Sequence, residues 1–404
     1  MMHAVPLSLY IHLPWCIRKC PYCDFNSHAT EQAAFPEQDY IAALIRDLDF
    51  DLPGIQGREI HSIFIGGGTP SLFSPQALQS LLAAIMSRLT LVANVEITLE
   101  ANPGTVEAAR FAAYRQIGIN RLSIGIQSFN DQMLQRLGRI HNAATAREAI
   151  RIAQTAGFER INIDLMYGLP QQTQEQAMAD LLQGMEAATT HLSWYQLTIE
   201  PNTIFYKHPP AVPEEELIWT MQQSGQHLLA ASGFQQYEIS AYAKPEQQCR
   251  HNLNYWQFGD YLGLGAGAHG KLSNPGSNTV TRYVRHRMPD RYMQLAGDAK
   301  VLSDTRVLTS EDRVLEFMMN ALRLTNGFEH RQFTQRTGLS LDSILPAIDQ
   351  ATRKGWLQTR DNRTWPTTSG LDFLNDLLQC FMQEPGATTH TGNSQDRHAD
   401  SLKL

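Results

Sequence analysis

Three cysteines stand within eight residues near the start of the chain, in the segment Cys16-Ile-Arg-Lys-Cys20-Pro-Tyr-Cys23. The other two of the five cysteines, Cys249 and Cys380, lie far away in the sequence. Thiolates are ligands for soft metals. Three of them on one short loop therefore predict either a zinc ion or an iron–sulfur cluster.

The two kinds of metal site differ in what they need from the rest of the chain. A structural zinc ion needs a fourth ligand, for which His12 and His28 are candidates. A four-iron cluster with three cysteine ligands keeps one iron open, and an open metal position can bind a small molecule. The alternating, apolar segment 7–14 directly before the cysteines is typical of a core strand and favours the iron site.

The elements that must position this loop follow a repeating order of strands and helices. Strands are expected at residues 7–13, 62–66, 96–100, 121–127, 161–167 and 191–199. Helices are expected at residues 40–49, 75–88, 106–117, 145–156, 173–188 and 214–232. Alternating strands and helices predict an α/β fold with a parallel sheet, and six such units predict a partial (β/α)6 barrel.

Polar or turn-forming residues recur where the predicted strands end. They are Gly66-Gly67-Gly68-Thr69, Glu100, Gln127, Asp164 and Glu200. Functional groups in such barrels gather at the carboxyl ends of the strands. Each motif alone also fits an ordinary turn. Because all of them follow the ends of predicted strands, as the cysteine loop does, together they predict one site.

The pattern changes beyond about residue 300. Short helices are expected at 315–324, 333–337 and 341–354, followed by a hairpin of 356–359 with 363–367. This order resembles a small α+β, winged-helix-like domain. We predict a barrel core over residues 1–240, a connecting segment over 241–300, the C-terminal domain over 301–383 and a disordered tail over 384–404.

Composition excludes several classes of function. The formal charge of −7 argues against nucleic acid as a partner, because phosphate contacts need concentrated basic residues. The basic stretch 282–291 is interpreted as a solvated face. No apolar run reaches the eighteen residues of a membrane span, and the N-terminus lacks the features of a signal peptide. The few, clustered cysteines predict a cytoplasmic protein.

The C-x3-C-x2-C spacing after a first strand resembles that of the radical S-adenosylmethionine (SAM) enzymes. The resemblance implies a 4Fe–4S cluster whose open iron is chelated by SAM, and one-electron cleavage of the sulfonium. It also implies that Tyr10 lies at the methionyl end of SAM, that Tyr22 packs near the adenine, and that Gly67, Gly68 and Thr69 hold the amino group. A tight turn and ordinary aromatic packing are the competing explanations.

Four further residues match the polar SAM contacts of one branch of this family. They are Glu100, Gln127, Arg139 and Asp164. The guanidinium of Arg139 suits bidentate recognition of a carboxylate. An internal salt bridge of Arg139 with Glu100 or Asp164 is the alternative.

That branch is the HemN/HemW branch, which resembles this chain over roughly residues 7 to 380. The motifs that carry the resemblance include Ile-Gly-Gly-Gly-Thr-Pro, Glu-Ala-Asn-Pro-Gly-Thr, Gly-Ile-Gln-Ser-Phe and Asp-Leu-Met-Tyr-Gly-Leu-Pro. The branch contains oxygen-independent coproporphyrinogen III dehydrogenases and haem chaperones. The dehydrogenases continue the cysteine motif with a fourth cysteine, but Phe25 stands at that position here.

The segment Cys249-Arg-His251-Asn252-Leu-Asn-Tyr255 resembles the H-N-x-x-Y motif of the haem chaperones. Imidazole, phenolate and thiolate all ligate haem iron, so the resemblance implies His251 or Tyr255 as the axial ligand, with Cys249 a further candidate. A loop held by hydrogen bonds is the alternative.

The sequence therefore predicts a chaperone that binds haem as cargo and delivers it to acceptor haemoproteins, among them respiratory enzymes. The alternatives are the dehydrogenase itself and a radical SAM enzyme that acts on another substrate.

Overall fold

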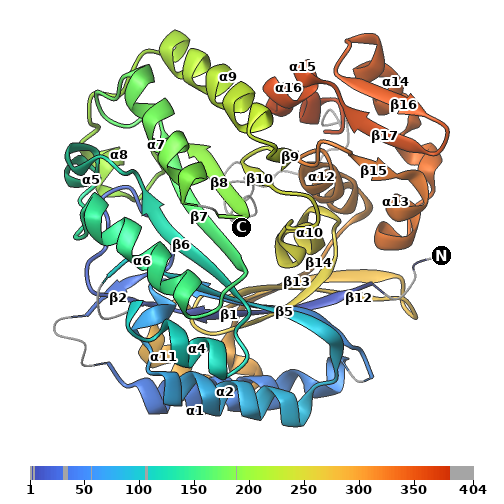
Figure 1. The fold of residues 1–404 in the computed structure, drawn as a ribbon. Helices are drawn as coiled ribbons and strands as arrows, with labels where there is room; N and C mark the ends of the chain where they lie inside the picture. Colours follow the sequence, from blue (N-terminus) through green and yellow to red (C-terminus); the bar gives the residue numbers. More distant parts are fainter. Residues whose placement is uncertain are drawn as a thin grey trace.

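The computed structural model describes residue 2 and residues 5–30, 35–55, 57–104, 108–187 and 189–382. Its main feature is a twelve-stranded sheet in the order β14-β13-β12-β11-β1-β4-β5-β6-β7-β8-β10-β9 (Figure 1). The tail predicted to be disordered, 384–404, lies outside the described residues.

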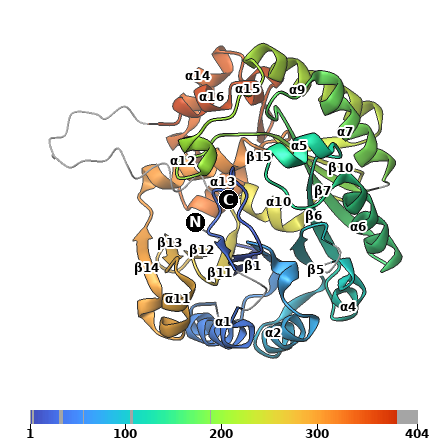
Figure 2. The same ribbon diagram turned by 90° about the vertical axis from the view of Figure 1, so that its left-hand side faces the viewer.

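The six predicted strands form the centre of this sheet, and all of them pair in parallel. They are β1 (Leu7–Leu13), β4 (Ile60–Gly67), β5 (Leu91–Ala101), β6 (Arg121–Gln127), β7 (Arg160–Tyr167) and β8 (His191–Gln196). Helices follow them as α1 (Glu37–Asp51), α2 (Pro75–Arg88), α4 (Phe111–Gln116), α6 (Ala143–Thr155), α7 (Gln174–Glu186) and α9 (Glu215–Ala231). These helices form an arc outside the strands (Figure 2). The predicted α/β partial barrel is confirmed.

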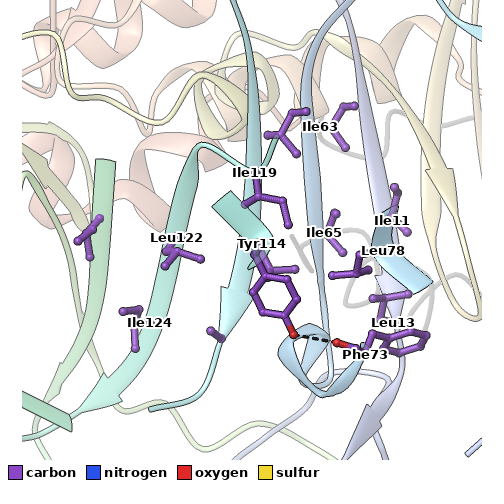
Figure 3. Close-up of a cluster of buried hydrophobic side chains, with 14 of the residues drawn as sticks. Ile11, Leu13, Ile63, Ile65, Phe73, Leu78, Tyr114, Ile119, Leu122 and Ile124 are labelled. Atoms are coloured by element: carbon purple, nitrogen blue, oxygen red, sulfur yellow. Dashed lines mark hydrogen bonds between the residues drawn. The ribbon is translucent and has the colours of Figure 1, made fainter. Parts of the chain in front are cut away.

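Apolar side chains between the strands and the outer helices make up the main core (Figure 3). Ile63 and Leu122 of the sheet and Leu78 of α2 are fully buried, and burial of each such side chain contributes roughly 1.5–3 kcal/mol. The hydroxyl of Tyr114 is buried with them and donates to the carbonyl of Phe73 at 2.8 Å. The core is therefore apolar, and the buried Tyr114 hydroxyl within it is hydrogen-bonded, as burial favours.

Strands that the sequence did not indicate extend the sheet at both edges, and most of them lie in the connecting segment 241–300. Strand β11 (Asp260–Leu264) pairs in parallel with β1, and β12 (His269–Asn274), β13 (Thr279–Arg285) and β14 (Leu302–Val307) continue antiparallel. At the other edge lie β9 (Gln235–Glu238) and β10 (Ala241–Ala243).

In these strands, charged residues occupy buried positions and so interrupt the alternation of apolar and polar residues by which a strand is recognised in the sequence. The Lys271 ammonium lies 2.8 Å from the Asp260 carboxylate, and Arg285 lies 3.0 Å from Asp47, with all four side chains buried. The interpretation of 282–291 as a solvated face is wrong for Arg285, which is fully buried, because its strand faces the core at every second residue.

The C-terminal module has its own core. Its elements are α12 (Ser310–Ala321), β15 (Phe328–Glu329), α13 (His330–Thr337), α14 (Leu345–Arg353), β16 (Leu357–Arg360), β17 (Arg363–Pro366), α15 (Thr368–Asp372) and α16 (Leu374–Gln379). Phe317 packs edge-to-face on Phe328 and Phe333, each at 5.1 Å between ring centroids. Among the described helices, none combines the length and apolarity needed to cross a membrane.

Candidate functional site

The three clustered cysteines line one wall of a cavity of about 940 Å³ at the carboxyl ends of the barrel strands. Cys16 ends the short strand β2 (Trp15–Cys16), which pairs with β3 (His28–Ala29) and so closes the loop. Its thiol accepts a hydrogen bond from Thr69 at 3.4 Å, and Cys20 accepts one from Arg139 at 3.6 Å. Burial raises the pKa of Cys16 to about 11. A thiolate at this position therefore needs a cation beside it, as a bound metal provides.

The structure also bears on the fourth zinc ligand that the sequence left open. Both ring nitrogens of His12 are hydrogen-bonded, Nδ1 to the Tyr10 hydroxyl and Nε2 to the Asn26 carbonyl, each at 2.9 Å. Within the described residues, no three His, Cys, Asp or Glu side chains are placed to hold one metal ion between them.

The triple glycine after β4 packs directly against the cysteine loop. A Cβ on Gly68 would lie 2.6 Å from the carbonyl oxygen of Trp15, and Gly67 has a φ of +119°, which other residues rarely adopt. Thr69 follows, and its hydroxyl accepts a hydrogen bond from Asn102 at 2.9 Å. The glycines thus allow the end of β4 to approach the metal-binding loop closely.

Two half-buried carboxylates, Glu100 and Asp164, face the same cavity from β5 and β7. Glu100 accepts a hydrogen bond from the Gly67 backbone N–H at 3.0 Å, and Asp164 accepts one from Asn162 at 2.7 Å. Burial first and the neighbouring Asp164 second raise the pKa of Glu100 to about 8. Burial also raises the pKa of Asp164. Such a pair favours a ligand that carries positive charge.

Arg139 lies between these carboxylates and the cysteines but pairs with neither carboxylate. Its Nη2 donates to the Asn102 side chain at 2.7 Å and to the Gly125 carbonyl at 2.6 Å, while its buried Nε has no partner among the described residues. The predicted alternative, an internal salt bridge with Glu100 or Asp164, is not formed. Arg139 therefore lines the cavity with a guanidinium group that neither carboxylate neutralises directly.

The remaining predicted SAM contacts lie at two different depths. Tyr22 lines the cavity beside the cysteines, and Gln127 lines it with a left-handed backbone, φ 69°. The Gln127 side chain accepts a hydrogen bond from Tyr195 at 2.9 Å. Tyr10 lies deeper and does not line this cavity, but its hydroxyl bonds to His12.

A second chamber, of about 540 Å³, lies inside the barrel and shares Gly67, Glu100 and Asp164 with the first cavity. His251 and Tyr255 line it from α10 (Arg250–Trp256). Sequence reasoning placed both residues near the haem, and the structure brings them to the same connected space as the cysteines.

His251 is held firmly in this chamber. Its Nδ1 bonds to the Ser62 hydroxyl at 2.9 Å and its Nε2 to the Tyr255 hydroxyl at 3.0 Å. The ring stacks on Phe64 at 5.0 Å, and burial lowers its pKa to about 3. The imidazole is therefore neutral. Cys249 is also buried, and its thiol lies 3.6 Å from the Glu96 carboxylate.

Several cavity residues gave no signal in the sequence. On the far wall stand His269, Arg282, Arg306, Glu316 and Arg323, with Trp256 beside them. These residues come from β12, β13, β14, α12, the turn after α12 and α10, and none of them was predicted as a site residue. Only the pairing of the strands brings them together.

Comparison with known proteins identifies the family. The radical SAM superfamily model matches residues 10–182, and the HemN C-terminal domain model matches residues 308–373. The structure of coproporphyrinogen III oxidase (HemN) from Escherichia coli superposes with a TM-score of 0.79 over 94% of this chain and 90% of that chain. At 23% sequence identity, this match shows a shared fold.

Relatives in sequence extend over nearly the whole chain. "Heme chaperone HemW" of Escherichia coli is 49% identical over 95% of this chain and 100% of its own length. The protein of the same name from Haemophilus influenzae is 50% identical over 94% of this chain and 98% of its own length. The protein of the same name from Bacillus subtilis is 32% identical over 93% of this chain and 99% of its own length. The chain therefore belongs to the HemW family of radical SAM proteins.

Proposed function

We propose that this protein is a haem chaperone, which binds haem as cargo and transfers it to acceptor haemoproteins. The observation that carries the proposal is the position of the H-N-x-x-Y segment. Its His251 and Tyr255 line a chamber that is continuous with the cavity of the three cysteines. The relatives named for haem chaperoning match 95% and 94% of this chain, which supports the same role here.

The residues of the cavity fit a 4Fe–4S cluster and SAM. Cys16, Cys20 and Cys23 would hold the cluster, because all three line this cavity and no other described residue of its lining carries a thiol. The half-buried pair Glu100 and Asp164 would accept the positive groups of SAM. When bound, cluster and SAM supply one-electron chemistry.

The carboxyl end of SAM has its own partner. The guanidinium of Arg139 would bind the carboxylate of SAM, because its Nε has no hydrogen-bond partner among the described residues. The glycines 66–68 and Thr69 would then fix the amino end beside Glu100, since Gly67 already donates to that carboxylate. The protein's own contribution is to bind and orient the cofactor and to exclude water.

We further infer that the protein does not oxidise coproporphyrinogen III. Phe25 stands where the dehydrogenases carry a fourth cysteine, and its side chain is 56% exposed at the mouth of both cavities. A phenyl ring offers neither a thiol nor a proton at this position. We place the protein in the cytoplasm, where a reducing environment suits its clustered thiols.

Anaerobic reconstitution tests the proposal. The cluster-loaded protein should bind haem stoichiometrically and raise the activity of an apo-haemoprotein mixed with it. Incubation with coproporphyrinogen III, SAM and a reductant should yield no protoporphyrinogen. Clear formation of protoporphyrinogen, or failure to bind haem, would contradict the proposed function.

A further inference from the structure

We propose that the protein has a second binding site, for a small molecule with phosphate or carboxylate groups, whose occupation is transmitted to helix α10. The site is a pocket of about 410 Å³ between β9 and α10 on one side and α13, β15 and β17 of the C-terminal module on the other. It is called the junction pocket below. It shares no lining residue with the large cavity or the inner chamber. Binding of an anion there does not depend on the proposed function.

The lining of the junction pocket is rich in side chains that donate hydrogen bonds to anions. Arg331, Arg336 and Arg363 line it, together with the glutamines at positions 248, 257, 332 and 335. Among the described residues of the lining, Glu329 is the only carboxylate. It already pairs with Arg331 at 2.5 Å and with Arg363 at 2.9 Å. Cationic groups therefore outnumber anionic ones around the pocket, which favours an anionic ligand.

Arg336 lacks a counter-charge of its own. Its buried Nη1 has no hydrogen-bond partner in the described part of the chain. The carboxylate that attracts it, Asp260, lies 2.8 Å from Lys271 and 2.8 Å from Arg58, and Ser273 donates to both of its oxygens. Burial lowers the pKa of Arg336. A guanidinium nevertheless stays charged in a protein, so its removal from water is unfavourable until an anion binds beside it.

The size of the junction pocket and its apolar part define the kind of ligand. Leu253, Leu324 and Tyr237 line it, and all three belong to one hydrophobic cluster. Pockets of roughly 300–1,000 Å³ take small molecules, and a single inorganic ion would fill only a part of this one. The ligand that fits is therefore a small organic anion, such as a phosphate ester or a polycarboxylate.

The junction pocket lies against the reverse face of the helix that carries the haem motif. His251 and Tyr255 face the inner chamber, whereas Leu253 and Gln257 line the junction pocket. Two residues along an α-helix correspond to a rotation of about 200°. The two pairs therefore lie on opposite sides of α10, and a ligand in the junction pocket contacts the same helix as a ligand in the chamber.

Three hydrogen bonds connect the junction pocket to the two ends of α10 and to the chamber. The Tyr237 hydroxyl bonds to Nε2 of His191, which lines the chamber, at 2.8 Å. It also accepts a hydrogen bond at 3.4 Å from the backbone N–H of Cys249, the N-cap of α10. At the other end, the Gln332 side chain donates to the carbonyl of Gln257, the C-cap, at 3.2 Å. Occupation of the pocket should therefore restrain α10 at both ends.

The test of binding uses the full-length protein in a buffer free of other multivalent anions, with pyrophosphate and citrate as separate probes. Titration calorimetry measures the affinity. Thermal unfolding measures it independently, because a ligand that binds only the folded state raises the unfolding temperature as its concentration increases. Binding of pyrophosphate alone identifies phosphate as the recognised group, and binding of citrate alone identifies carboxylate. If neither probe binds at millimolar concentration, the site does not exist.

Substitutions locate the bound probe. Arg336→Gln and Arg331→Gln should each weaken probe binding about ten-fold, the effect of losing one charge-assisted hydrogen bond. Two matched controls should change it little, Arg353→Gln on the exposed side of α14 and Arg306→Gln in the large cavity. Probe binding that is unchanged in both pocket variants would overturn the site.

Stability without a probe gives a further readout for Arg336. Because Arg336→Gln removes a buried charge without its own counter-ion, the variant should unfold at the same temperature as wild type or above it. Wild type should overtake it as the probe is added. Arg331 has a side chain that is 73% exposed, so Arg331→Gln should fold normally and keeps the test decisive if Arg336→Gln does not.

Hydrogen exchange tests the coupling to α10. The backbone amides of residues 250–257 should exchange more slowly with the probe bound in wild type, but not in Arg336→Gln at the same probe concentration. Unchanged exchange in the probe-bound wild type would overturn the coupling. None of these measurements uses haem, so their failure leaves the proposed function standing, and a protein that fails to bind haem can still bind the anion here.

Discussion

The carboxylate of Glu96 on β5 accepts a hydrogen bond from the backbone N–H of Arg250 at 2.8 Å, which fixes the start of α10 beneath the barrel. The same carboxylate lies 3.4 Å from the guanidinium of Arg121, and both side chains are buried. One acidic residue thus holds the helix that carries His251 and neutralises a buried cation.

Glu96→Gln should therefore destabilise the protein strongly. It leaves the Arg121 charge buried without a counter-charge, and breaking one partner of a buried pair costs about 3–5 kcal/mol. Chemical denaturation followed by circular dichroism measures the loss in the free energy of unfolding. The surface control Glu148→Gln should leave the unfolding midpoint unchanged. Equal midpoints for wild type and Glu96→Gln would show that the pair is energetically neutral.

The cluster cysteines should each be essential for loading iron and sulfide. Cys16→Ser, Cys20→Ser or Cys23→Ser leaves only two thiolates on the loop, too few for a stable cluster with one open iron. Iron and sulfide analysis with visible absorption after anaerobic reconstitution measures the effect. Cys380→Ser, far from the site, is the matched control. A wild-type chain that takes up zinc tightly but refuses iron and sulfide would refute the cluster assignment.

Glu100 should make the SAM-free protein less stable as pH rises. The folded-state pKa of about 8 lies above the ordinary value of 4.5, so the folded protein holds the proton more tightly than the unfolded chain. The contribution of protonated Glu100 to the free energy of unfolding is fully present below about pH 4.5. It decreases as pH rises from about 4.5 to about 8, by at most about 1.4 kcal/mol per pH unit.

Glu100→Gln removes this dependence, because an amide does not ionise. The variant should gain stability relative to wild type as pH rises from 5 to 8. It should also bind SAM more weakly, because an amide cannot release a proton and become negative when the positively charged cofactor binds. Thermal unfolding of both proteins across this pH range, with SAM titrations at neutral pH, measures the two effects. The exposed Glu159→Gln should show neither. Parallel stability curves for wild type and Glu100→Gln would contradict the raised pKa.

Gly68→Ala should disturb the contact between the end of β4 and the cysteine loop. The added Cβ would lie 2.6 Å from the Trp15 carbonyl oxygen, which is backbone and cannot rotate away. Such overpacking costs about 1–3 kcal/mol. We expect lower thermal stability together with weaker SAM binding. Gly54→Ala, where a Cβ would meet nothing within 4 Å, is the control, and a similar effect of both substitutions would argue against the steric explanation.

Local sequence patterns were sufficient to predict much of the barrel. Helix α2 spans Pro75–Arg88, as predicted, because Ser74 accepts a hydrogen bond from the Ala77 N–H and proline suits the first helical turn. The predicted strand at Arg121–Gln127 is equally accurate, since its apolar Leu122, Ile124 and Ile126 recur at every second residue, the period of a strand. The cysteine spacing is local as well, and it alone indicated the metal site.

Other features depended on contacts between distant segments. Strand β11 was not predicted, because its charged Asp260 reads as a surface residue until Lys271 and Arg58 are brought beside it. His269, Val284 and Asp304 form one row across the sheet only through strand register. The raised pKa of Glu100 and the lowered pKa of His251 arise from burial.

Sequence by itself thus determined the central strands and helices of the barrel and the candidate residues for metal and cofactor binding. The tertiary structure decided which polar groups share one cavity, which of them keep a proton, and which donors stay available to a ligand. The physical reason is that helix and strand formation depends on neighbouring residues, whereas desolvation and ion pairing depend on groups that the chain brings together from far apart.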